Sequence, residues 1–437
     1  MWSKLGLLFI LTIYIMLGVA FAIRTPSWQN PDEPAHFNYV GNIAEGRGLP
    51  ILQKDDYDFD YLERIKAAKF PPDMSVDSIR YESHQPPLYY LVSTPVYLVT
   101  NSLPVAQQVI AQRFVSVFFG CLLLLVVYST VKAIFPERES LSLATVAVVA
   151  LLPQHVAMSA AINNDVFSEL LLSLLLLLLV KNPDESRRPQ SAYLITSGVV
   201  LGLILLTKVT IYIGVLIVPL ALALSRHEKI RLARIELGSA FQVLSIYLVA
   251  ALISGWWFIR NAVVYGVGDL LAMNRHSEVV FGQPATGIFN IAAARHFAAV
   301  TFKSFWLQLG WMGVPADATI YAVLALLTLL SGLGFILFVA RAAQEPGLLS
   351  RDQRRSLMLL GATLFLIFFV MFLYNLQFIQ PQGRYLFPAI LPLGLFFVLG
   401  LREIFSPRYI WLLLPLLLLG LFLIDIYALV RLVPYLY

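Results

Sequence analysis

Long apolar runs alternate with short polar connections along almost the whole chain. A hydrocarbon core about 30 Å thick needs roughly 20 apolar residues of helix to cross it. Eleven runs meet or approach this length, and we predict that each is a membrane-spanning helix. They cover residues 5–23, 110–131, 141–162, 166–180, 191–207, 209–225, 238–259, 318–340, 357–377, 385–401 and 409–431. The pattern predicts an all-α polytopic membrane protein of about 11 transmembrane helices, with residues 1–437 as a single domain.

The positions of lysine and arginine predict how these helices are oriented. Cytoplasmic connections of membrane proteins are enriched in basic residues. If the N-terminus is cytoplasmic, 16 of the 31 basic residues lie at that end or in short cytoplasmic connections. The short outer turns then hold almost none. The first span has an alternative reading, because residues 20–22 (Ala-Phe-Ala) resemble a signal-peptidase site. The apolar run is longer than a signal peptide needs, so we expect it to be retained.

Two connections on the opposite, extracytoplasmic side are much longer than the rest. They cover residues 24–109 and 260–317. Residues 86–101 of the first are moderately apolar, but a crossing there would reverse the side of every later connection. We therefore predict amphipathic helices at the membrane surface in this segment. Long polar connections commonly carry function, so these two extracytoplasmic segments are where chemistry is expected.

Composition agrees with the membrane assignment and excludes several function classes. The chain is 59% hydrophobic and 13% charged, against about 25% charged in ordinary soluble domains. Its one cysteine, Cys121, excludes a disulfide framework. A net charge of +5, with no basic cluster among aromatic residues, gives no indication of nucleic-acid binding. The signatures GxxxxGK[ST], HExxH and GxSxG are absent, and with them the usual marks of ATP-driven transport, zinc proteolysis and serine hydrolysis.

The strongest polar signal follows the first span, at residues 31–36 (Pro-Asp-Glu-Pro-Ala-His). Asp32 and Glu33 are adjacent carboxylates close to the membrane surface. His36 lies four residues after Asp32, so both side chains would share one face of a helix. These carboxylates could act as a base, or they could simply cap the helix that Pro34 begins. His84, which ends the polar part of the same segment, is a second candidate histidine.

A third acidic candidate, Asp165, ends the turn 163–165 (Asn-Asn-Asp) between two apolar runs. Glu169 follows one turn later inside an apolar segment, where a carboxylate is costly unless it has a partner. The alternative for Asp165 is again helix capping, by this residue or by Asn164.

Isolated cations accompany these acids on the predicted outer side. Arg384, next to Tyr385, is the only charged residue between Ser356 and Leu401, and Lys208 stands alone between two apolar runs. Arg260 follows an aromatic run. A guanidinium can bind an anion through two hydrogen bonds. Three separate cations on the side that carries the carboxylates predict a binding site for a phosphate-bearing lipid.

The order of these motifs resembles the GT-C superfamily of polyprenyl-phosphate-dependent glycosyltransferases, which includes the protein O-mannosyltransferases and the aminoarabinose transferase that modifies lipid A. The matching segments are 31–36, 84–90, 163–165, 255–261, 304–306 and 382–385. The full set is most similar to a family of bacterial and archaeal membrane proteins known as a domain of unknown function. The resemblance implies a GT-C-like helical bundle in a prokaryotic plasma membrane, and a catalytic acid at Asp32 or Glu33.

The sequence and the resemblance together predict transfer of a sugar from a polyprenyl-phosphate donor to a hydroxyl of a lipid, glycan or protein acceptor. Asp32, or next Glu33, would be the base, and Arg384 would hold the phosphate with Lys208 and Arg260 as further choices. His36, His84, Asp165 and Tyr385 would bind substrate. The sequence establishes no cofactor, and a divalent metal ion is an optional one. A transporter or flippase of lipid-linked saccharides, or a ligase of cell-envelope polymers, remains an alternative.

Overall fold

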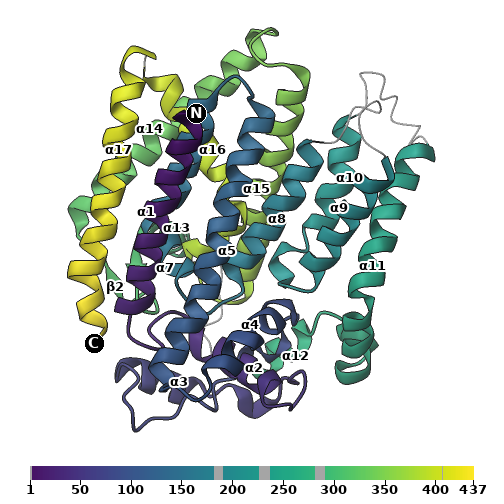
Figure 1. The fold of residues 1–437 in the computed structure, drawn as a ribbon, viewed down its shortest axis with the longest axis vertical. Coiled ribbons are helices and arrows are strands. Elements are labelled where there is room, and N and C mark those ends of the chain that lie inside the picture. The colour runs from purple at the N-terminus through teal and green to yellow at the C-terminus, as the bar shows by residue number, and fades with distance from the viewer. Residues whose placement is uncertain (1, 182–189, 226–236, 281–290, 406) are drawn as a thin grey trace.

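The computed structural model describes residues 2–181, 190–225, 237–280, 291–405 and 407–437. Helices dominate these residues (Figure 1). The α-helices are α1 (Trp2–Arg24), α2 (Glu33–Ala44), α3 (Phe59–Ala67), α4 (Leu88–Thr100), α5 (Val105–Ile134), α6 (Glu139–Ala150), α7 (Pro153–Ser159), α8 (Asp165–Val180), α9 (Gln190–Leu205), α10 (Gly214–Ser225), α11 (Leu237–Tyr265), α12 (Met273–Val279), α13 (Ile291–Trp306), α14 (Ala318–Gln344), α15 (Arg351–Gln377), α16 (Ile390–Ile404) and α17 (Pro407–Tyr427).

Short 3-10 or π turns extend or join several of these helices. They are η1 (Lys54–Asp56), η2 (Tyr81–His84), η3 (Val209–Ile211), η4 (Val267–Asp269), η5 (Gly383–Ala389), η6 (Ala428–Leu432) and η7 (Val433–Leu436). A two-stranded antiparallel hairpin of β1 (Gln308–Leu309) and β2 (Val314–Pro315) was not predicted, because each strand has only two residues.

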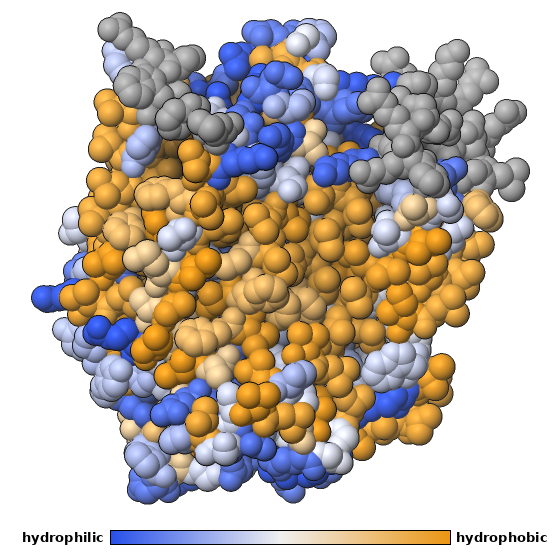
Figure 2. Space-filling view, in the orientation of Figure 1, coloured by the Kyte–Doolittle hydropathy of each residue, from blue (hydrophilic) through white to orange (hydrophobic). Residues whose placement is uncertain are grey.

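The long helices run side by side, and on the face shown in Figure 2 an apolar belt covers them between two polar ends (Figures 1 and 2). Within the described residues, seven helices are long and apolar enough to cross a membrane, or eight if α6 and α7 form one bent span. Each of the eleven predicted spans falls on a helical segment. The count of eleven is not confirmed, because α8, α9 and α10 are shorter than a full crossing. The all-α polytopic architecture is confirmed.

The predicted span 141–162 is broken where the chain reaches Pro153. The axes of α6 and α7 differ by 66° across this break. A residue that precedes proline is driven out of the helical region, and Leu152 has an extended conformation with φ −76° and ψ 109°. Pro153 then begins α7, where its missing N–H costs nothing. The short α7 therefore ends close to the turn that carries Asp165.

The two long connections fold against each other at the end of the molecule opposite the N-terminus, where α2, α3, α4 and α12 gather (Figure 1). Leu52 and Ile65 from the first connection and Val279 from the second share a small apolar core. The helix expected at residues 86–101 is present as α4, and its 13 residues are too few to span a bilayer. These elements form a polar cap on the helical bundle.

Close packing of α14 on α16 depends on two glycines. A Cβ atom at Gly334 would lie 2.0 Å from the carbonyl oxygen of Gly400, and one at Gly400 would lie 1.9 Å from the carbonyl oxygen of Ser331. Small residues allow this approach of two backbones, which is a common packing device between membrane helices. The hydroxyl of Ser331 donates to the carbonyl of Phe397 at 2.9 Å across the same contact.

We expect Gly334→Ala to destabilise the protein by about 1–3 kcal/mol or more, because the added methyl group overlaps backbone atoms of α16. Thermal unfolding of the detergent-purified protein measures this effect. The control is Gly332→Ala on the same helix, since a Cβ atom there would meet no atom within 4 Å. The control should be neutral or slightly stabilising. Equal melting temperatures for the two variants would contradict the packing described.

Candidate active site

Two carboxylates and two cations from distant parts of the chain meet in one ionic cluster, which we call the Asp32–Arg384 cluster. Nη2 of Arg384 contacts Oδ2 of Asp32, and Nη1 of Arg384 lies 3.6 Å from Oδ2 of Asp165. Lys208 contacts the other oxygen of Asp165. The side chains of all four residues are between 5% and 21% exposed. The predicted convergence of acids and cations is therefore present.

Asp32 holds its position through an unusual backbone conformation. Its φ of 67° and ψ of −3° lie in the left-handed region, which is uncommon for a residue with a side chain. The carboxylate makes no capping bond to α2, so capping is not its role. Instead, the Tyr81 hydroxyl donates to Oδ1 at 2.7 Å. Burial acts to raise the pKa of Asp32, but the Arg384 guanidinium outweighs it and lowers this pKa to about 2.

Arg384 is positioned by its own turn, η5, and by close contact with α13. Its Nε donates to Oε1 of Gln382 at 2.7 Å, and its guanidinium lies 5.4 Å from the centre of the Tyr385 ring. The N–H of Gly383 donates to the Ser304 hydroxyl at 2.8 Å. A Cβ atom at Gly383 would lie 2.2 Å from the backbone nitrogen of Phe305, so only glycine fits here. The segment Gln382–Tyr385 thus aims the guanidinium at the two carboxylates.

Asp165 and Lys208 come from two turns that are tied together. The backbone N–H of Asp165 donates to Oδ1 of Asn163 at 3.0 Å. Asn164 precedes α8 without a side-chain capping bond, and its amide donates to the Thr207 carbonyl at 3.2 Å, directly before Lys208. The two turns thus bring the carboxylate of Asp165 to Lys208 and Arg384.

The predicted histidines lie around the cluster and are buried. Nδ1 of His36 is 2.9 Å from the Tyr90 hydroxyl. Burial lowers the pKa of His36 against the opposing charges of Glu82 and Asp32. Nδ1 of His84 donates to the Tyr81 carbonyl at 3.0 Å, and burial lowers the pKa of His84 to about 4. Both imidazoles are therefore neutral at physiological pH.

Glu33 is adjacent to Asp32 but serves a different part of the molecule. Its two carboxylate oxygens accept hydrogen bonds from Nε and Nη2 of Arg113, both at 2.7 Å. The backbone N–H groups of Trp28 and Ile162 also donate to it, at 2.9 and 3.2 Å. The side chains of Glu33 and Arg113 are at most 1% exposed. The geometry therefore favours Asp32 over Glu33 as a base, since the Glu33 carboxylate is fully engaged in a buried ion pair.

Arg260 also has contacts away from the cluster. Its Nη2 donates to the Pro50 carbonyl at 2.5 Å and its Nη1 to Oδ1 of Asn261 at 3.0 Å. The guanidinium lies over the rings of Trp257 and Tyr265, at 4.9 and 5.4 Å from their centres. These contacts connect α11 to the first long connection. Arg260 thus supports the polar cap, whereas Arg384 and Lys208 form the cluster.

Two further residues of the site were missed from the sequence. Tyr81 donates to Asp32, and Glu82 lies close enough to interact electrostatically with His36 and Asp32. Burial raises the pKa of Glu82. Both come just before His84, so the neighbourhood of that histidine was the available signal. A tyrosine or a single acid in an acidic segment carries no signal of its own.

The cluster does not fit a metal ion as it stands. In the described part of the chain, no group of three or more His, Cys, Asp or Glu side chains could hold a metal. Asp32 and Asp165 are both neutralised by cations. A divalent ion would have to displace Arg384 from between them.

One protein-family model matches the middle part of the chain. A family model described as dolichyl-phosphate-mannose-protein mannosyltransferase matches residues 84–258. No curated protein sequence matches the chain. The matched region includes Asp165 and Lys208 but neither Asp32 nor Arg384.

Two solved structures are similar over nearly the whole chain. ArnT from Cupriavidus metallidurans, bound to undecaprenyl phosphate, has a TM-score of 0.58 and 14% identity over 95% of this chain. The archaeal oligosaccharyltransferase AglB from Archaeoglobus fulgidus, in complex with an inhibitory peptide and a dolichol-phosphate, has a TM-score of 0.56 and 14% identity over 100% of it. The chain spans 62% and 56% of their lengths. The GT-C fold expected from the resemblance is confirmed.

We expect Glu33→Gln to destabilise the protein by about 3–5 kcal/mol, because it leaves the buried Arg113 guanidinium without its counter-charge. Asp32→Asn should cost less, since Asp32 is partly exposed and Arg384 retains Asp165 nearby. Unfolding curves of the two variants provide the comparison. A larger loss for Asp32→Asn would contradict the division of roles between these neighbours.

Stability should fall as the pH drops from about 6.5 to 4, partly because of His84. The unfolded chain takes up a proton near pH 6.5, whereas the folded state resists it until about pH 4. The difference amounts to about 3 kcal/mol. His84→Gln should remove this part of the acid sensitivity in thermal unfolding between pH 7 and 4. His296→Gln, at an exposed histidine, should leave it unchanged.

Proposed function

We propose that this protein is a membrane glycosyltransferase that moves a sugar from a polyprenyl-phosphate donor to an acceptor hydroxyl on the extracytoplasmic face. The observation that carries the proposal is the sharing of Arg384 between Asp32 and Asp165. A guanidinium beside a carboxylate supplies the two groups that this reaction needs, an anion binder and a proton acceptor. The GT-C fold and the match to the mannosyltransferase model support the reaction class.

The phosphate of the donor binds to Arg384 and Lys208. Each of these cations is now paired with a carboxylate, and a phosphate dianion or diester competes for the same N–H groups. When Arg384 turns to the phosphate, Asp32 loses its counter-charge, and the pKa of this carboxyl rises towards its ordinary value. Asp32 then becomes a stronger base while Tyr81 still holds it in place.

The acceptor hydroxyl attacks the anomeric carbon of the sugar as its proton passes to Asp32. The new carbon–oxygen bond forms while the bond to the phosphate oxygen breaks, and polyprenyl phosphate leaves with the electron pair. Arg384 and Lys208 stabilise the charge that develops on the leaving group. A single displacement inverts the anomeric centre. His36, His84 and Tyr385 border the cluster and position the substrates.

The proposed orientation of the protein in the membrane rests on the position of the N-terminus and on the distribution of basic residues along the sequence. Asp32 directly precedes α2, and α2 lies at the end of the molecule opposite the N-terminus (Figure 1). By the distribution of basic residues, that end faces away from the cytoplasm. Donor lipid reaches it from the apolar belt, and the acceptor comes from the aqueous side or the outer leaflet.

A transporter of lipid-linked saccharides is the second candidate, because acidic side chains also lie within the bundle. Nε2 of His155 is 2.8 Å from Oε2 of Glu169, and both side chains are buried. Asp425 is fully buried, and its two oxygens have no hydrogen-bond partner among the described residues. Intramembrane acids are typical of transport pathways. The glycosyltransferase is favoured because Arg384 and Lys208, the cations proposed to bind the phosphate, both lie in the Asp32–Arg384 cluster.

Transfer of labelled sugar from polyprenyl-phosphate donors by the purified protein tests the proposal. We expect Asp32→Asn to lower kcat by about 10²–10⁴-fold, as for the loss of a general base. Arg384→Gln should raise the KM for the donor as well as lower kcat. The control is Asp60→Asn in α3, an exposed aspartate of the same connection, which should retain full activity.

The same assay separates the alternatives. Full transfer by Asp32→Asn would remove Asp32 from the reaction. Absence of transfer with every donor, together with movement of a labelled donor across proteoliposomes, would identify a transporter instead. Retention of configuration in the product would exclude the single displacement.

A further inference from the structure

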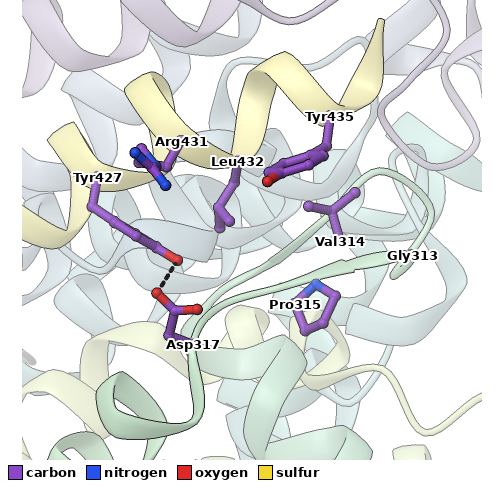
Figure 3. A pocket seen from close by; sticks show the side chains of 8 residues that line it. All are labelled: Gly313, Val314, Pro315, Asp317, Tyr427, Arg431, Leu432 and Tyr435. Carbon is purple, nitrogen blue, oxygen red and sulfur yellow. Dashed lines mark hydrogen bonds between the residues drawn. The ribbon is translucent and has the colours of Figure 1, made fainter.

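A second polar site lies beside the hairpin, away from the Asp32–Arg384 cluster. It is a pocket of about 680 Å³ between β2 and the last turns of the described chain (Figure 3). Pockets for small ligands commonly have volumes of about 300–1,000 Å³. Asp317, Tyr427, Arg431 and Tyr435 supply its polar lining.

The pocket contains a cation and an anion that are not paired with each other. The hydroxyl of Tyr427 donates to Oδ2 of Asp317 at 2.8 Å (Figure 3). Asp317 directly precedes α14 but makes no side-chain capping bond to it, so its carboxylate is directed to the pocket instead. Arg431 follows Tyr427 by one turn, and no carboxylate within the described chain forms an ion pair with it. The pocket therefore has a positive group, Arg431, and a negative group, Asp317, that can bind different parts of one ligand.

The position of the pocket makes it accessible from the membrane. Asp317 lies where the span of α14 begins, and Tyr427 ends the α-helical part of the last span. Val430, which precedes Arg431 in the chain, is 59% exposed, and the Tyr435 ring in the pocket lining is 64% exposed. An apolar rim with charged groups behind it matches the boundary between acyl chains and headgroups.

We propose that this pocket binds the headgroup of a membrane lipid that carries both a phosphate and a primary amine. The guanidinium of Arg431 donates two N–H hydrogen bonds to the phosphate oxygens. Asp317 accepts hydrogen bonds from the ammonium group. The acyl chains lie over Val430 and the outer face of α17. An anionic headgroup without an amine is disfavoured because it would bring a second negative charge to Asp317.

Native mass spectrometry of the full chain, released from detergent with defined lipids, measures this binding. We expect phosphatidylethanolamine to bind more tightly than phosphatidylcholine or phosphatidylglycerol. Arg431→Gln should weaken phosphatidylethanolamine binding about tenfold or more, since a tenfold change corresponds to about 1.4 kcal/mol. Asp317→Asn should remove the preference over phosphatidylglycerol, a change of selectivity that a merely structural role would not produce.

The control is Arg341→Gln at the other end of α14, which pairs with Glu403 at 2.8 Å and should leave lipid binding unchanged. Equal binding of the three lipids by the unaltered protein would overturn the proposal. So would an equal loss in the Arg341 and Arg431 variants. Competition by inorganic phosphate or phosphoethanolamine as effective as that of the intact lipid would assign the pocket to a soluble phosphate compound instead. None of these outcomes bears on sugar transfer, because lipid binding is measured without a donor.

Discussion

The site depends on one shared guanidinium. Arg384 lies 352 positions along the chain from Asp32, and the ion pair between them joins the first connection to the turn before α16. An unpaired charge at a membrane boundary is costly, so each of these residues requires the other. The cluster of two acids and two cations is neutral in sum. The helical bundle must therefore close completely before the site exists, and the site in turn stabilises the closure.

The adjacent acids Asp32 and Glu33 show how one backbone torsion can separate structure from chemistry. A left-handed residue reverses the local path of the chain, so Asp32 is directed to η5 while Glu33 is directed to α5. Glu33 and Arg113 then fix the loop from within, through contacts that are fully buried. Strain of this kind persists only where surrounding contacts determine it. The buried pair thus supplies the rigidity that holds the partly exposed carboxylate of Asp32 in place.

The sequence predicted those features whose signal is local. Hydropathy marks each long helix. Arg384 and Lys208 could be identified as site residues because a lone charge between apolar runs is costly unless it has a partner. The helix break at residues 150–153 had a local cause in Pro153, but the apolar run concealed it. The pairing of Glu33 with Arg113 was not predicted, although Arg113 is a charge inside the predicted span 110–131, because the sequence does not show which acid meets a cation 80 positions away. The same holds for Tyr81, whose role exists only through the fold.

On the proposed function, the ion pair between Asp32 and Arg384 determines the order of events. A carboxylate held by arginine, with its pKa lowered to about 2, is a weak base and would not activate a hydroxyl or a stray water molecule. The phosphate of the donor is the group that releases it, because the phosphate competes for the same guanidinium. Base strength is therefore coupled to occupancy of the donor site.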